Sequence, residues 1–251
     1  IGVMFIDNFC SRGVTSTWRD QSNATIASTA IDTMMAYKVL KNHLRSNGKI
    51  GLTGHSRGGT NALIVSDIKF TSLFLKGTEG FDAIIGEAAE CRMAGLFLEP
   101  ELTTNTKILY VHGSIDNLTL AKPCEEHLNK IKAKPGQIKI DIKEGWHHDW
   151  HAGFKPKKVK AMTLHTCPAV QVDNEGNVTG PIVDLGLKKY KLFPSQAEWI
   201  KATEDDPQKT MKTVFKMFKK EKCSKRGVTI GGMHGDEYLP QFINFFKENL
   251  L

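Results

Sequence analysis

Residues 52–63 read LTGHSRGGTNAL, and this stretch decides the fold because it joins two kinds of segment at one serine. Residues 50–53 form a short apolar run typical of a buried strand, whereas residues 58–62 open a helix-type stretch. Between them, GHSRG (54–58) fits the G-x-S-x-G nucleophile elbow, in which the serine lies exposed on a sharp strand-to-helix turn. We therefore predict that Ser56 is a nucleophile and that the backbone N–H of Arg57 donates to an oxyanion. A structural turn serine is the alternative.

Strand-type and helix-type segments alternate along the chain. In the first expected helix, Ile31, Met34, Met35 and Val39 share one apolar face at helical spacing. Alternation of this kind predicts an α/β fold, a mostly parallel sheet with helices on both faces and an active site at the carboxyl ends of the strands. The expected strands are 2–6, 49–53, 82–86, 107–111 and 138–142.

An acid and several imidazoles follow two of these strands. A serine nucleophile needs a base, and the base needs an orienting carboxylate, in the chain order Ser, Asp or Glu, His. Asp116 stands just past the strand 107–111, and EGWHHDWH (144–151) follows the strand 138–142. The sequence therefore predicts Asp116 as the acid. It leaves three candidates for the base: His147, His148 and His151. His234 is a rival base, although its Gly-rich turn favours a role in the turn or the helix cap.

Four motifs in order resemble the dienelactone hydrolase family of α/β-hydrolases, particularly its exported, serine-bearing, esterase-like members: FCSRG (9–13), GHSRGG (54–59), HGSIDNLT (112–119) and EGWHHDW (144–150). The resemblance covers roughly residues 1–155. It implies the α/β-hydrolase fold, Ser56 as nucleophile, Asp116 as acid and His148 as base, since the family's base stands three residues after a glycine and two before an aromatic residue. The founding members use cysteine as nucleophile, so lactone hydrolysis is not implied.

The start of the chain departs from this pattern. The fold usually places several strands before the elbow, and the loop after one of them donates the second oxyanion N–H. Only one expected strand precedes the elbow strand here, so we expect the N-terminal strands to be missing or truncated. The second donor then lies upstream or in the loop at residues 8–10. Position 1 is Ile, which suggests that an upstream piece was removed or left out.

The resemblance also implies a pairing of the five cysteines. Exported members carry cysteines at positions that match Cys91 with Cys124, and a second pair matches Cys167 with Cys223, which leaves Cys10 free near the pocket mouth. Disulfides form in oxidising compartments, so the expected location is periplasmic or secreted, with a signal peptide removed. Spacing alone leaves five buried thiols in a cytosolic protein as the alternative.

The composition limits the classes of binding partner that we expect. Lys plus Arg outnumber Asp plus Glu by 34 to 27, but the lysines are scattered without interleaved aromatics, which favours a solvated surface over a nucleic-acid groove. No apolar run reaches the length of a membrane span. His147, His148 and His151 could bind zinc, but no upstream carboxylate or cysteine stands at ligand spacing. We therefore expect no nucleic acid, no membrane span, no metal and no cofactor.

The resulting hypothesis is a single domain, 1–251, that hydrolyses a small carboxylic ester through an acyl-enzyme. Arg12, Cys10 and His147 are the expected substrate-lining residues, and Arg12 could instead pin its loop by bonding backbone carbonyls. Residues 155–200 are expected to form an irregular insertion near the active site. The alternatives are a catalytically silent binding protein of the same fold, and a peptidase or acyltransferase with the same triad. The sequence does not predict an oligomeric state.

Overall fold

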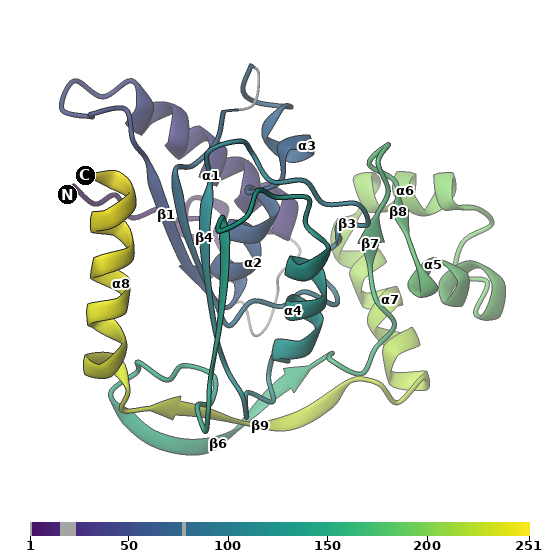
Figure 1. Cartoon of the computed structure of the whole chain (residues 1–251). Coiled ribbons are helices and arrows are strands. Elements are labelled where there is room, and N and C mark those ends of the chain that lie inside the picture. The colour runs from purple at the N-terminus through teal and green to yellow at the C-terminus, as the bar shows by residue number, and fades with distance from the viewer. Residues whose placement is uncertain (1, 16–23, 77–78) are drawn as a thin grey trace.

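The computed structural model describes residues 2–15, 24–76 and 79–251, and a four-stranded parallel sheet lies at its centre (Figure 1). The strands stand in the order β1-β2-β4-β5, and every neighbouring pair is parallel; helices link β1 to β2 and β4 to β5, whereas the segment between β2 and β4 holds only a short strand. Four of the five expected strands are therefore confirmed, with ends that differ by at most two residues from prediction. Their bounds are Gly51–His55 (β1), Ala83–Glu87 (β2), Lys107–Gly113 (β4) and Ile138–Lys143 (β5).

Helices cover both faces of this sheet. Successive side chains of a strand point to opposite faces, so Ile84 and Ile108 pack in one apolar cluster while Ile85 and Leu109 pack in another. Figure 1 shows α8 on one side of the sheet and α1, α2 and α4 on the other, which confirms the predicted α/β class. The covering helices are α1 (Ile26–Lys41), α2 (Arg57–Ile64), α4 (Ala121–Lys130) and α8 (Gly235–Leu250).

The strand expected at residues 2–6 is absent. A strand needs a hydrogen-bonding neighbour, and no described strand pairs with this segment. Its apolar side chains are consequently exposed, and Phe5 is 92% accessible. The elbow strand β1 is therefore an edge strand of the described sheet, with no described strand before it in the chain. A short 3-10 turn, η1 (Cys10–Arg12), follows the segment.

The apolar face expected for the first helix was wrong in three of its four residues. Only Met34 is buried, whereas Ile31, Met35 and Val39 are exposed. The buried face carries threonines whose polar atoms are satisfied locally, since Thr33 Oγ1 donates to the Thr29 carbonyl at 2.9 Å. Hydrogen-bonded hydroxyls can be buried at little cost, so the helix turns this mixed face inward: Thr29, Ala30, Thr33, Met34, Ala36 and Tyr37.

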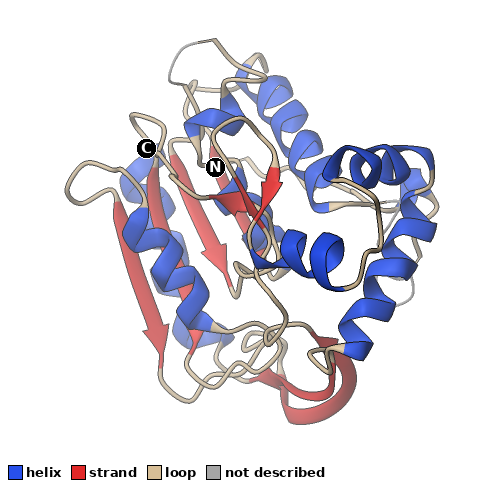
Figure 2. Cartoon of the chain, turned by 90° about the vertical axis from the view of Figure 1, so that its right-hand side faces the viewer, coloured by secondary structure: helices blue, strands red, loops and turns tan. Residues whose placement is uncertain are grey.

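The region expected to be irregular contains regular structure. An antiparallel ribbon of β6 (Phe154–Thr163) and β9 (Lys225–Gly232) leads out of the main body and back. Figure 2 shows the arrowheads of the central sheet pointing towards the end of the molecule where this ribbon lies. Between the two ribbon strands, a small unit holds β7 (Gln171–Val172), β8 (Val178–Thr179), α5 (Pro181–Asp184), a π-helical turn η2 (Leu185–Lys189), α6 (Gln196–Asp205) and α7 (Pro207–Lys220). Its strand β7 pairs with β3 (Leu96–Phe97) on one side and with β8 on the other, and α3 (Ile68–Thr71) lies in the main body.

Both expected disulfides are present. Cys91 pairs with Cys124 and ties the segment after β2 to α4, while Cys167 pairs with Cys223. The second pair lies inside the apolar cluster of the small unit, with Ile182, Val214, Met217 and Phe218 around it. Cys10 is free and exposed, as expected. Within the described residues, no helix is long and apolar enough to cross a membrane.

The disulfide of the small unit should carry much of its stability. It closes a loop with a sequence separation of 56, for which the chain-entropy model gives about 4 kcal/mol. We expect the double variant Cys167→Ala/Cys223→Ala to lower the free energy of unfolding by an amount of this order in urea titrations without reductant. Cys10→Ala is the control and should leave it unchanged. Equal effects of the two changes would contradict this prediction.

Candidate active site

Ser56 lies on a strained turn between β1 and α2. Its backbone angles are φ 55° and ψ −113°, in a region that residues with a side chain rarely adopt. The turn is held from outside, because the Ser56 N–H donates to the Glu87 carbonyl at 2.8 Å, at the end of the neighbouring strand. Strain of this kind persists only where the surrounding structure enforces it. The predicted elbow is therefore present in the backbone.

Two glycines make this turn sterically feasible. A Cβ on Gly54 would stand 2.3 Å from the carbonyl group of Gly58, and a Cβ on Gly59 would stand 2.3 Å from the Glu87 carbonyl oxygen. Nothing lies within 4 Å of a Cβ built on Gly58. The close approach of strand and helix therefore requires Gly54 and Gly59, while Gly58 contributes its main chain.

Asp116 and His148 form a buried pair. Asp116 Oδ2 lies 2.6 Å from His148 Nδ1, and Asp116 Oδ1 accepts the N–H groups of Leu118 at 2.9 Å and Thr119 at 3.0 Å. The ionised carboxylate accepts hydrogen bonds only, so the proton of the neutral imidazole is assigned to Nδ1. Nε2 then carries a lone pair, which is the arrangement that a general base requires.

Two further side chains support this pair. Tyr110 hydrogen-bonds through its hydroxyl to Nδ1 of the fully buried His112, and His112 Nε2 lies 3.2 Å from Asp116 Oδ2. Burial raises the pKa of Asp116, but the hydrogen bonds of His112 and His148 outweigh it and hold the pKa well below its ordinary value. Sequence analysis missed His112, although it begins the HGSIDNLT motif, because only the fold shows which side of the carboxylate it occupies.

Ser56 stands at the same edge as this pair without a direct hydrogen bond to it. Among the described residues, no hydrogen bond joins the Ser56 hydroxyl to His148. His55, the residue before Ser56, has its ring centroid 4.9 Å from that of His148. Catalytic hydrogen bonds are often long in a structure without substrate. The structure thus brings Asp116 and His148 together, and Ser56 lies at the same edge of the sheet, directly after β1.

The C-terminal part of the chain holds the loop that carries His148. The Gly231 N–H, on β9, donates to the His148 carbonyl at 2.7 Å. Trp146 and Trp150 on either side of His148 are buried against α8. His147 is half-buried, and its Nδ1 has no hydrogen-bond partner among the described residues. The adjacent histidines therefore have different surroundings, and only His148 reaches the acid.

His234 contacts this loop from the start of α8. Its ring stacks on Trp146 with centroids 4.6 Å apart, and its Nδ1 lies 3.3 Å from Glu237 Oε2. It occupies the residue before the first turn of α8, although its side chain makes no capping hydrogen bond. The expected role in the helix cap therefore applies to its position but not to its side chain, which packs on Trp146 instead.

His55 lies between two carboxylates. Its Nε2 is 2.9 Å from Asp149 Oδ1, and its Nδ1 is 3.7 Å from Glu87 Oε2. Burial lowers the pKa of His55, but the two carboxylates outweigh this effect and raise the pKa to about 9. Two sets of possible metal ligands occur here within the described residues: His55 with Glu87 and His151, and His55 with His148 and Asp149. Sequence analysis considered the histidines of the loop and overlooked His55 and Glu87.

The two predicted arginines have side-chain contacts within the protein. Arg57 is the first residue of α2, so its backbone N–H lies at the amino end of that helix, and its guanidinium donates to the Ala24 carbonyl. The Arg12 guanidinium binds both oxygens of Asp32, at 2.6 and 2.8 Å, and also the Asn8 carbonyl at 2.9 Å. Of the two roles left open for Arg12, the structure displays the loop-pinning contact.

The loop at residues 8–10 is closed by an aspartate. The N–H groups of Phe9 and Cys10 both donate to Asp7 Oδ1 at 2.9 Å. These are two of the N–H groups that this loop could offer to an oxyanion. In the described structure they are therefore engaged by Asp7, and the second oxyanion donor stays unassigned.

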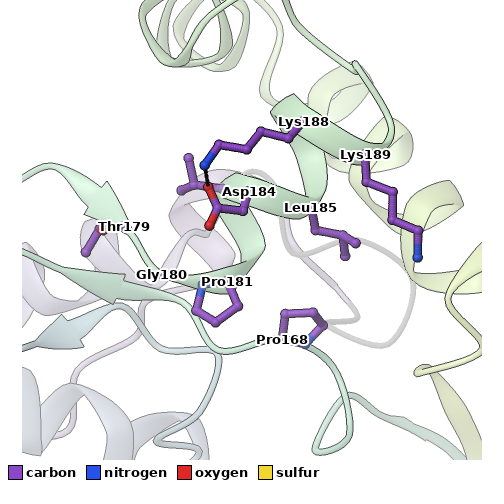
Figure 3. A pocket seen from close by; sticks show the side chains of 9 residues that line it. Pro168, Thr179, Gly180, Pro181, Asp184, Leu185, Lys188 and Lys189 are labelled. Atoms are coloured by element: carbon purple, nitrogen blue, oxygen red, sulfur yellow. Dashed lines mark ion pairs between the residues drawn. The ribbon is translucent and has the colours of Figure 1, made fainter.

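A separate hollow of about 650 Å³ lies in the small unit, away from the elbow (Figure 3). Pro168 and Pro181 line it together with Leu185, and Lys188 pairs with Asp184 at its rim at 2.8 Å. None of the predicted site residues lines it. Most of its lining residues belong to β8, α5 and η2 of the small unit.

Comparison with solved structures finds distant α/β-hydrolase enzymes. MGS-M1, an α/β hydrolase from a Medee basin deep-sea metagenome library, is 18% identical with a TM-score of 0.38 over 50% of this chain and 52% of its own. Est1E from Butyrivibrio proteoclasticus is 14% identical (TM-score 0.36; 49% and 62%), and esterase PE8 is 21% identical (0.33; 54% and 60%). This chain thus spans little more than half of those proteins. No protein-family model and no curated protein matches it.

At these TM-scores the fold assignment rests on the chain's own topology. Ser56 follows β1, Asp116 follows β4 and the loop with His148 follows β5, all at the carboxyl edge of one parallel sheet. Serine, acid and histidine in this order on such a sheet define the α/β-hydrolase arrangement. The chain has the α/β-hydrolase fold, with β1 at the edge of its described sheet.

The charge on Asp116 should make stability depend on pH. A carboxylate whose pKa is lowered by folding stabilises the protein above its unfolded pKa, about 3.9, and this contribution is lost as the pH falls through the folded value. We expect Asp116→Asn to cost about 1 to 3 kcal/mol at neutral pH, since buried donors lose their acceptor. In urea unfolding, the difference in the free energy of unfolding between this variant and the unchanged protein should shrink below about pH 4. The exposed Asp205→Asn is the control, and a pH-independent difference would contradict the prediction.

Proposed function

We propose that the protein is a serine hydrolase that cleaves a carboxylic ester through an acyl-enzyme. The Asp116–His148 hydrogen bond of 2.6 Å carries this proposal, because a buried, charge-assisted contact on Nδ1 leaves Nε2 to accept a proton. The strained Ser56 on the elbow at the same edge supplies a hydroxyl that needs such a base. In this proposal His148 takes the Ser56 proton during attack on the ester carbonyl, and later returns it to the leaving alcohol.

The oxyanion would be stabilised at the amino end of α2. Arg57 begins this helix, so its N–H is directed along the axis at the positive end of the helix dipole. Hydrolysis then completes when His148 activates a water that attacks the acyl-enzyme. Asp116 keeps the imidazole in the required tautomer throughout, and the buried His112 behind it fixes the carboxylate.

The substrate is proposed to be a small-molecule ester that reaches Ser56 from the carboxyl edge of the sheet. Among the predicted lining residues, Cys10 and Arg12 stand on the loop at η1 and His147 on the histidine loop. The two disulfides favour an oxidising location, periplasmic or secreted, for this activity. A panel of p-nitrophenyl esters with graded acyl chains would identify the preferred acid portion.

A silent binding protein with the same fold is the second candidate. It is favoured by the lack of a hydrogen bond between Ser56 and His148 among the described residues, together with the engagement of the Phe9 and Cys10 N–H groups by Asp7. The two candidates differ in one property: an enzyme activates the Ser56 hydroxyl, whereas a binding protein leaves it inert.

Reaction with a fluorophosphonate probe tests this difference. We expect the native protein to be labelled on Ser56, because the probe forms a covalent bond only with a serine that a base activates. Ser56→Ala should show no labelling in intact-mass and peptide-mapping measurements, while the exposed Ser72→Ala should label like the unchanged protein. Absence of labelling in the native protein would support the binding-protein candidate.

The assignment of the base is tested with the neighbouring histidines. We expect His148→Ala to lower kcat on the best p-nitrophenyl ester by a factor on the order of 10⁶, the scale seen for triad members. His147→Ala and His151→Ala should retain most of the activity, since neither contacts Asp116. If His147→Ala were the inactive variant, the base would have been assigned to the wrong residue.

A further inference from the structure

Three potential metal ligands meet beside the elbow from separate parts of the chain. The parallel register of β1 and β2 pairs His55 with Glu87 at the carboxyl ends of the two strands. His151 reaches the same point from the loop after β5, with its ring centroid 4.7 Å from that of His55 and the rings nearly perpendicular at 85°. One ligand atom from each of the three residues lies within 4.8 Å of the other two.

The nitrogen of His55 that faces this group has no hydrogen-bond partner. Nε2 is 2.9 Å from Asp149 Oδ1, and donation of Nε2–H to this carboxylate leaves a lone pair on Nδ1. Nδ1 is buried, forms no hydrogen bond among the described residues and stands 3.7 Å from Glu87 Oε2. Two acceptor atoms that face each other in a buried place repel, so a positive charge between them is required. Either a proton on Nδ1 or a cation can supply it.

One carboxylate oxygen of Glu87 is available to bind a cation. Its side chain is 8% exposed, and Oε1 accepts the Thr53 hydroxyl at 3.2 Å while Oε2 is the atom nearest His55. A buried carboxylate is costly unless it is paired or coordinates a metal. His151 is exposed, so an ion can enter from its side.

We propose that His55, Glu87 and His151 form a binding site for Zn²⁺, with Asp149 orienting the His55 ring. Two imidazoles and one carboxylate are a typical zinc donor set, with a fourth position open to water, whereas Mg²⁺ and Ca²⁺ prefer oxygen ligands. Ligand atoms about 2.0 to 2.2 Å from a tetrahedral zinc ion stand roughly 3.5 Å apart, close to the spacing of the pair His55 and Glu87. In such sites, the ring nitrogen of the histidine that does not bind zinc commonly donates its N–H to a carboxylate.

The other possible set, His55 with His148 and Asp149, is less suited to an ion. His148 Nδ1 is already bound to Asp116, and its Nε2 is the nitrogen that the proposed hydrolysis needs. Asp149 already accepts from His55. In the set with Glu87, His55 Nδ1 has no hydrogen-bond partner among the described residues, and Glu87 Oε2 is the carboxylate oxygen nearest to it.

An ion at this position would join three segments. His55 belongs to the end of β1, Glu87 to the end of β2, and His151 to the loop that carries His148. Ligand binding to the folded state alone raises stability by mass action. The site is independent of the proposed hydrolysis, because none of its three ligands belongs to the proposed triad.

Equilibrium dialysis of the full chain against Zn²⁺, after treatment with EDTA, tests the proposal. We expect one tightly held ion per chain by elemental mass spectrometry, a raised Tm, and an intense visible spectrum of four-coordinate Co²⁺ when cobalt replaces zinc. Asp149→Asn, which removes the orienting charge, should weaken zinc binding roughly 10- to 100-fold, and loss of a ligand in Glu87→Gln or His151→Ala should weaken it more.

Matched controls separate this site from surface binding. The exposed His43→Ala removes an imidazole elsewhere and should bind zinc like the unchanged protein. His151 is exposed, so His151→Ala carries the test even if Glu87→Gln fails to fold. Absence of a stoichiometric ion in the native protein would overturn the proposal and leave a proton on His55 Nδ1. Undiminished zinc binding by His151→Ala would overturn it as well.

Discussion

The close approach of the elbow to the end of β2 is the constraint on which the site depends. The main chain of Glu87 accepts the Ser56 N–H at 2.8 Å and leaves no space for a Cβ on Gly59, so it fixes both the strained serine and the start of α2. Its side chain faces His55 from the same position. A single residue at a strand end thus holds the turn by its backbone and sets the electrostatics beside it by its carboxylate, which couples the two features physically.

Local patterns in the sequence were sufficient for the central sheet and the elbow. Buried parallel strands appear as short apolar runs, and the glycines around Ser56 mark a turn that few other sequences can form. The first helix shows where such patterns fail. Ile31, Met35 and Val39 form the more apolar stripe, but the helix buries threonines that bond their own turn and Asn61. The spacing of apolar residues does not show that a hydroxyl already forms a hydrogen bond within its own helix, so this spacing predicted the wrong buried face.

The small unit could not be predicted from the sequence for a related reason. Its apolar residues surround the Cys167–Cys223 disulfide and come from segments far apart in the chain, so no single segment shows a clear period. The pairing itself could be predicted only through the resemblance to exported hydrolases, since five cysteines permit several pairings on spacing alone. With the covalent link in place, short helices such as α5 and α6 need to bury little surface of their own.

The pairing of Asp116 with His148 could be predicted because each residue follows its own strand, whereas the environment of His55 could not be predicted. Asp116 and His148 are recognised within single motifs, and their meeting follows once the strands are parallel neighbours. His55 and Glu87 become partners only through the register of β1 with β2, and His151 joins them only through the path of a loop. A search for metal ligands along the sequence looks for donors a few residues apart, and so it considered the loop histidines with one another. The fold instead brings together donors from two strand ends and one loop, and the buried nitrogen of His55 without a hydrogen-bond partner among the described residues indicates which of them face one another.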